Sequence, residues 1–96
     1  MANSVQSILD KNNDPDFIKL KEYLEGCSQE EVSGIIAIMY IGKDISEGSQ
    51  FPDPFREYQL AYRQYFVWRK VDIVRQIMGK TDLVEYLRIG SLALDM

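Results

Sequence analysis

Seven consecutive apolar residues, 35–41, constrain the fold more than any other feature of this 96-residue chain. On a helix such a run is apolar on every side, and a helix of that kind has to be buried. Residues 28–31, Ser-Gln-Glu-Glu, precede the run as a capping box, with serine and glutamate three positions apart. A buried strand is the rival structure for the run, but the capping box favours a helix. We therefore expect a central helix over about residues 29–41, ended by Gly42.

Residues of the same kinds mark the other helix boundaries. A serine, threonine or aspartate caps a helix start, a proline fits the first helical position, and a glycine ends a helix. The expected starts are Ser4, Asp14-Pro15, Asp53-Pro54 and Thr81, and the expected ends are Gly26 and Gly79. Residues 42–53, with two glycines, a proline and small polar residues, indicate a loop. The prediction is an all-α bundle of four or five helices around the central one, in a single domain spanning residues 1–96.

The longest segment, residues 54–78, contains a conflict. At 100° per residue, one continuous helix gathers an apolar stripe on one side. The stripe consists of Leu60, Val67, Val71, Val74 and Met78, with Phe55, Phe66, Ile73 and Ile77 alongside. Arg56, Arg63 and Lys70 fall among these residues, and burying an unpaired cation costs on the order of several kcal/mol. A break near residues 64–67 resolves the conflict. It is favoured over a continuous helix whose cations pair with acids from the first half of the chain.

A second stripe of the same segment is aromatic. It consists of Tyr58, Ala61, Tyr65 and Trp68. An aromatic stripe at helical spacing is usually a core contact, here with the first two helices. The other interpretation is an exposed patch flanked by arginines, a combination enriched where binding energy concentrates in interfaces. The candidate partner-binding residues are Tyr65, Trp68 and Arg69 first, and Tyr58 and Arg63 second.

The net charge of −4 is unevenly distributed. Residues 1–53 carry four lysines against ten acids, whereas residues 54–80 carry six cations against two acids. The basic segment either packs against acidic neighbours or offers a face to an acidic partner. Nucleic acid is the alternative partner, because aromatic residues are interleaved with the cations. A pI near 4.7 and the lack of a recognised nucleic-acid-binding motif argue against it.

An apparent calcium loop at residues 10–21 fails at its two decisive positions. Its oxygen ligands would be Asp10, Asn12, Asp14 and Asp16. The sharp turn requires a glycine where the chain has Pro15, and Lys21 replaces the bidentate glutamate. These acids are better explained as helix caps that complement the helix dipole. We expect no metal site.

Catalytic equipment is equally sparse. The chain has no histidine, which removes the usual general base and the commonest metal ligand. Glu30 and Glu31 occupy the first turn of a helix, where acids are favoured electrostatically. Cys27 is the single cysteine, which excludes an internal disulfide, and we interpret it as a small apolar filler. No glycine-rich phosphate loop is present. We therefore expect no enzymatic activity, no cofactor and no small-molecule substrate.

Two stretches carry a resemblance to a known family. Residues 28–44 lead from the capping box through the apolar run to Ile-Gly-Lys-Asp, and residues 83–90 read Leu-Val-Glu-Tyr-Leu-Arg-Ile-Gly. Together they resemble an uncharacterised family of small bacterial proteins, a domain of unknown function. Its members have an acidic start to an apolar helix that ends in Gly-Arg-Asp, where this chain has Lys43, and a closing Tyr-Leu…Gly helix. The resemblance implies an α-helical fold and a bacterial or phage cytoplasmic origin, and it brings no functional residues.

These features together predict a non-enzymatic protein-binding module. A regulator, an inhibitor, an immunity-type protein or an anti-defence protein would use the aromatic and arginine face of residues 54–78. Homodimerisation through the same stripe is compatible, because a thin core gains stability from association. The alternative is a nucleic-acid-binding protein that uses the basic residues 54–80. We expect a cytoplasmic location and no membrane partner, because no secretory signal and no apolar run of about 18 residues occur.

Overall fold

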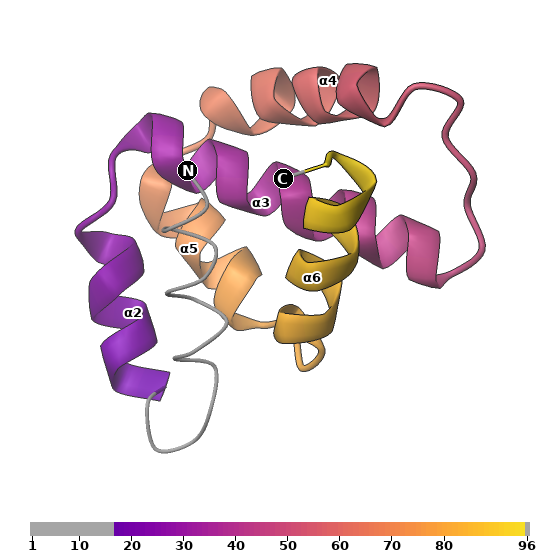
Figure 1. The fold of residues 1–96 in the computed structure, drawn as a ribbon. Helices are drawn as coiled ribbons and strands as arrows, with labels where there is room; N and C mark the ends of the chain where they lie inside the picture. The colour runs from indigo at the N-terminus through magenta and orange to yellow at the C-terminus, as the bar shows by residue number, and fades with distance from the viewer. Residues whose placement is uncertain (1–16, 96) are drawn as a thin grey trace.

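Five helices follow one another in the computed structural model, which describes residues 17–95 (Figure 1). They are α2 (Phe17–Glu25), α3 (Gln29–Ser46), α4 (Pro54–Phe66), α5 (Lys70–Met78) and α6 (Leu83–Ala93). No strand occurs in this part of the chain, and the all-α prediction is confirmed. The expected first helix at Ser4, the Asp14-Pro15 start and the acids of the calcium-like loop lie outside the described residues. None of the described helices is long and apolar enough to cross a membrane.

Helix α3 forms the centre of the molecule, as its apolar run predicts. In Figure 1 it runs between α4 on one side and α5 and α6 on the other, and it packs against all three. The capping box is present, because the Ser28 hydroxyl accepts from the Glu31 N–H at 3.1 Å and the Ser28 N–H donates to Glu31 Oε1 at 2.8 Å. Every residue from 35 to 39 is buried, and Leu20, Leu24 and Cys27 belong to the same hydrophobic core.

The predicted end of α3 at Gly42 is wrong, since the helix continues to Ser46. Its actual end is a Schellman motif around Gly48, whose φ of +102° is a left-handed conformation that glycine adopts without strain. The Gly48 N–H donates to the Ile45 carbonyl at 3.0 Å, and the Ser49 N–H donates to the Asp44 carbonyl at 2.9 Å. The loop therefore begins at Glu47, five residues later than predicted, and Gly42 has a different role.

Gly42 lies where α3 crosses α6. A Cβ atom at Gly42 would stand 1.8 Å from the Tyr86 carbonyl oxygen, and one at Gly90 would stand 2.1 Å from the Ile38 carbonyl oxygen. Both neighbours are backbone atoms, so neither can move aside as a side chain could. The two glycines let the helix backbones approach each other closely, and this crossing fixes α6 on the core.

The predicted break in residues 54–78 is confirmed, although it falls slightly later than residues 64–67. Helix α4 ends at Phe66 and α5 begins at Lys70. Gln29 holds the connection, because its side-chain amide donates to the carbonyls of Phe66 at 3.0 Å and Trp68 at 2.8 Å. The Lys70 ammonium donates to the carbonyls of Glu25 at 2.6 Å and Cys27 at 2.9 Å. Lys70 thus satisfies carbonyl groups at the end of α2 rather than lying unpaired in the core.

The remaining boundaries agree with their predicted signals, except for one. Helix α2 ends before Gly26 and α5 ends before Gly79. The Asp53 carboxylate accepts from the Arg56 N–H at 3.3 Å at the start of α4. The prediction of Thr81 as the last cap is wrong by one residue, because Asp82 is the residue that precedes α6. No side-chain cap bond forms at Asp82, and the buried Leu83 and Leu87 hold α6 in place.

Candidate protein-binding surface on α4

Helix α4 is attached to the bundle by half-buried aromatic residues, and none of its residues is fully buried. The Tyr65 ring stacks on Tyr40 of α3, with ring centroids 5.6 Å apart and an interplanar angle of 8°. The Tyr58 hydroxyl lies against Gly34, where a Cβ atom would come within 3.1 Å of it. The small size of Gly34 therefore leaves room for this tyrosine between the two helices.

Burial raises the pKa of the Tyr58 phenol, and the neighbouring Tyr62 phenol adds to the shift. Burial is also the main cause that raises the pKa of Tyr65, with Tyr40 as a further cause. The phenols of Tyr58 and Tyr65 are therefore held in the neutral form. Both rings pack against the hydrophobic core.

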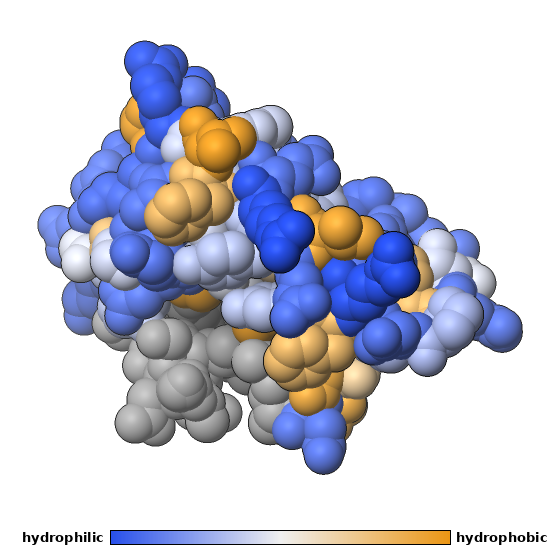
Figure 2. Space-filling model, turned by 90° about the horizontal axis from the view of Figure 1, so that it is seen from above, coloured by the Kyte–Doolittle hydropathy of each residue, from blue (hydrophilic) through white to orange (hydrophobic). Residues whose placement is uncertain are grey.

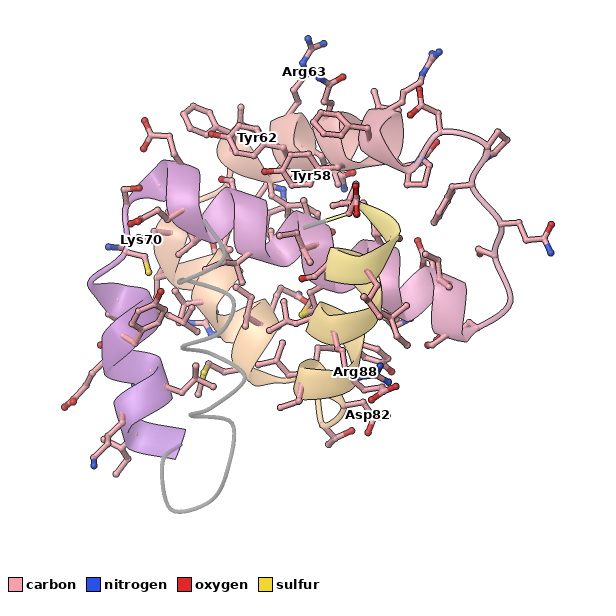
Figure 3. All side chains as sticks on the ribbon, in the orientation of Figure 1. Tyr58, Tyr62, Arg63, Lys70, Asp82 and Arg88 are labelled. Atoms are coloured by element: carbon pink, nitrogen blue, oxygen red, sulfur yellow. The ribbon has the colours of Figure 1, made fainter. Side chains whose placement is uncertain are left out.

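The five residues named from the sequence as partner contacts do not form one exposed cluster. Tyr58 and Tyr65 contact the core, on α3 rather than on the first two helices. Trp68 is exposed, and its ring lies edge-on to the Tyr65 ring with the ring centroids 4.8 Å apart. The Arg69 side chain is 80% exposed and pairs with Asp72 at 3.2 Å. Arg63 is exposed and, as Figure 3 shows, points away from the bundle, whereas Tyr58 lies between α4 and α3.

The apolar residues that a continuous helix would gather on one side are divided between core and surface. Of their α5 members, Ile73, Val74 and Ile77 are buried and Met78 is half-buried, whereas Val71 is 52% exposed. Phe55, Leu60 and Val67 are instead 58%, 50% and 83% exposed. The break explains this, because it frees the rotation of α4 from that of α5 and lets the aromatic stripe face α3. Six of the eight large apolar side chains that are exposed in the described part fall within residues 55–71.

The exposed side of α4 combines apolar and basic residues, and we call it the outer face. It consists of Phe55, Arg56, Leu60, Arg63, Phe66 and Val67, all exposed. Helical spacing places the two arginines between an aliphatic row, Leu60 and Val67, and an aromatic row along Phe55 and Phe66. Figure 2 looks down on this side of the molecule and shows apolar patches separated by strongly hydrophilic ones. Tyr62 adjoins the aromatic row and stacks on Phe66 with ring centroids 5.7 Å apart.

The two arginines of the outer face differ from the other cations of residues 54–80. Lys70 binds two carbonyls, Arg69 and Arg75 both pair with Asp72, and Lys80 lies 5.3 Å from the centre of the Tyr40 ring. The side chains of Arg56 and Arg63 form no ion pair with any residue between 17 and 95. Their charge is therefore available to a partner.

A groove of about 480 Å³ lies between α2 and α5. Its lining residues are Lys21, Glu25, Lys70, Val71, Val74, Arg75, Met78 and Gly79. The volume falls within the range of small-molecule sites. Two of its cations are already engaged, because Lys70 holds the end of α2 and Arg75 pairs with Asp72 at 3.3 Å. The groove thus combines an apolar floor of Val71, Val74 and Met78 with the charged side chains of Lys21 and Glu25 at its α2 side.

No group of three or more potential metal ligands lies together among the residues that the structure describes. The chain matches no family model, no curated protein and no solved structure. The outer face of α4 is therefore interpreted from its own chemistry.

Proposed function

We propose that this chain is a non-enzymatic protein-binding module whose partner covers the outer face of α4. The concentration of exposed apolar side chains within residues 55–71 carries this proposal. Single exposed apolar residues are ordinary, whereas a concentration of them on one face is typical of interaction sites, and on α4 they form two rows with Arg56 and Arg63 between them. Helix α4 contributes to the core only through half-buried side chains, so its outer residues are not needed for the bundle itself.

The composition of the face supports a protein partner. Aromatic residues and arginine are enriched among residues that dominate binding energy. Phe55, Phe66, Arg56 and Arg63 would supply such contacts, with Leu60 and Val67 completing the apolar surface. Trp68 and Arg69 extend it at the corner between α4 and α5. Tyr58 and Tyr65 would act indirectly, because their contacts with α3 position the helix.

A comparison of two double variants tests the proposal. Leu60→Gln with Val67→Gln removes two exposed aliphatic residues from the outer face. Ile18→Gln with Leu92→Gln removes two exposed aliphatic residues from α2 and α6 and serves as the matched control. Affinity capture from a nuclease-treated lysate of the native source, quantified by mass spectrometry, should recover a stoichiometric protein with wild type and control but not with the α4 variant. Equal recovery by both variants would refute the proposed site.

Nucleic-acid binding through the basic residues 54–80 is the weaker alternative. Lys70 and Lys80 contact groups within the protein, the exposed Arg69 and Arg75 share the single Asp72 carboxylate, and Arg56 and Arg63 have no ion pair in the described part. The segment therefore offers few uncompensated charges, and a small number of phosphate contacts supplies little of the electrostatic affinity on which non-specific binding depends. A gel-shift titration at low salt with single-stranded and duplex probes should therefore show no complex. A salt-sensitive shift that is lost in Arg56→Gln/Arg63→Gln would favour this alternative.

A further inference from the structure

The outer face of α4 repeats after seven residues. Arg56 is followed by Arg63, and Leu60 by Val67, while Phe55 is followed at the same interval by the aromatic Tyr62. Val67 still has helical backbone angles, with φ −89° and ψ −4°, so the helical spacing applies to it. Within the outer face the spacing holds for Arg56 with Arg63 and for Leu60 with Val67, whereas Tyr62 is half-buried beside the face and the polar Gln59 stands seven positions before Phe66.

A seven-residue repeat is the pattern by which one helix keeps the same face toward a second helix lying alongside it. The arginines at positions 56 and 63 stand about 10.5 Å apart along the axis, at 1.5 Å per residue. On a partner helix of matching direction, two residues that are also seven positions apart would meet them.

Charge complementarity defines the chemistry of those two residues. Arg56 and Arg63 lie between two apolar rows and have no ion pair among the described residues. A partner that covers the rows removes water from the guanidinium groups, and an uncompensated charge in such a place is strongly unfavourable. Carboxylates supply the compensation, and they can bind a guanidinium group through two hydrogen bonds at once.

We propose that the partner contacts α4 with an amphipathic, acidic α-helix. This helix lies along α4, presents two carboxylates seven residues apart to Arg56 and Arg63, and covers the aliphatic and aromatic rows with apolar side chains on either side. The inference rests on the proposed function and adds the chemistry of the bound segment and its alignment along the axis of α4.

Face-to-face pairing of two copies of α4 does not meet the requirement. Pairing of two outer faces would bring four guanidinium groups into one interface. Glu57, the acid within α4, lies 100° around the helix from Arg56 and is half-buried, so it cannot compensate them. Like charges facing each other across an interface oppose association.

Synthetic helical peptides serve as probes. Three 21-residue peptides share a leucine and alanine framework and carry two glutamates seven residues apart, two lysines at the same positions, or two glutamates five residues apart. Fluorescence anisotropy should show wild type binding the first peptide at least about tenfold more tightly than either of the others. The double variant Arg56→Glu/Arg63→Glu should reverse the preference, so that the lysine peptide binds more tightly. Arg56→Gln/Arg63→Gln should remove the preference.

Equal affinity of wild type for the glutamate and lysine peptides would overturn the inference, as would a charge reversal that leaves the preference unchanged. Urea unfolding of each variant establishes that the exposed substitutions leave the fold intact. Failure of this inference differs from failure of the proposed function. A native partner that is lost with Leu60→Gln/Val67→Gln but retained with Arg56→Glu/Arg63→Glu would refute the acidic helix and leave the binding surface standing. Retention with both variants would refute the surface itself.

Discussion

Replacing Gly42 by alanine is the substitution for which the structure predicts the largest effect from the smallest change. The added methyl group would lie 1.8 Å from the Tyr86 carbonyl oxygen, 2.6 Å from its carbonyl carbon and 2.9 Å from the Gly90 nitrogen. Ordinary contacts of a carbon with a carbonyl oxygen are about 3.3–3.6 Å. Helices α3 and α6 therefore have to separate by roughly 1.5 Å to accommodate it.

The energetic consequence follows from this displacement. Overpacking a core typically lowers the free energy of unfolding by about 1–3 kcal/mol. Because the methyl group would clash with the backbone of both Tyr86 and Gly90, we expect a strain energy at or above the upper limit of this range. Alanine gains about 0.8–1.0 kcal/mol over glycine in helix propensity, which offsets part of the loss. We expect Gly42→Ala to lower the free energy of unfolding by at least about 2 kcal/mol. That is a large share of the roughly 5–14 kcal/mol typical of a domain of this size.

Gly34→Ala is the matched control, because it adds the same methyl group to the same helix. Its nearest neighbour is the Tyr58 hydroxyl at 3.1 Å, the end of a side chain that can move by a few tenths of an ångström. The gain in helix propensity and the small strain then nearly cancel, and we expect the free energy of unfolding of Gly34→Ala to differ from that of wild type by less than about 1 kcal/mol. Urea denaturation followed by circular dichroism measures both variants. A Gly42→Ala protein as stable as wild type, or an equal loss in Gly34→Ala, would refute the account of the crossing.

Three further predictions concern single groups. Ser33 is fully buried and its hydroxyl has no hydrogen-bond partner. Ser33→Ala should therefore raise the free energy of unfolding, measured by urea denaturation, by about 0.5–1.5 kcal/mol. A lower free energy of unfolding in the variant would show that the hydroxyl is hydrogen-bonded. The folded pKa values of Tyr58 and Tyr65 are raised, so the stability from their neutral phenols is complete below the unfolded value of about 10 and is lost as pH rises through the folded values. Urea denaturation between pH 8 and 11 should show this loss in wild type and a smaller one in Tyr58→Phe/Tyr65→Phe, whereas equal losses would contradict it. Lys70→Met leaves the Glu25 and Cys27 carbonyls without their ammonium donor and should destabilise the protein by about 1.5–3 kcal/mol. Amide hydrogen exchange in α2 should become faster, and unchanged exchange would mean that the two hydrogen bonds do not hold the helix.

Local signals predicted most of the fold correctly. The capping box, the Asp53-Pro54 start and the glycines that end α2 and α5 act over a few residues, so the sequence contains the whole cause. The break between α4 and α5 was also predictable, because a continuous helix would have buried three cations. Gly42 was misinterpreted because a glycine that ends a helix and a glycine that admits a second helix look alike in sequence. Only the approach of Tyr86 and Gly90, some 45 residues away, distinguishes them.

The orientation of α4 was beyond local reasoning. Its two faces are both rich in large apolar residues, so helical periodicity identifies two stripes without deciding which one faces the core. Helix α3 determines which face of α4 is turned inward, because Gly34 leaves room for Tyr58 and the Tyr40 ring stacks on Tyr65. As a result, the sequence indicated the segment that carries most of the exposed apolar side chains but emphasised the tyrosines that anchor the helix. A signal for the outer face was present in the seven-residue recurrence of Arg56 and Leu60 at positions 63 and 67.

Site-specific photo-crosslinking in cells of the native source would show whether a protein partner covers the outer face of α4. A photoreactive amino acid would replace Val67 on the outer face of α4 or, as the matched control, the similarly exposed Ile18 on α2. A partner that covers the outer face should give one predominant protein adduct from position 67 and none from position 18. This adduct should be lost when Arg56 and Arg63 are also replaced by glutamate. Identical adduct patterns from the two positions, or no protein adduct from position 67, would contradict a specific partner on this face.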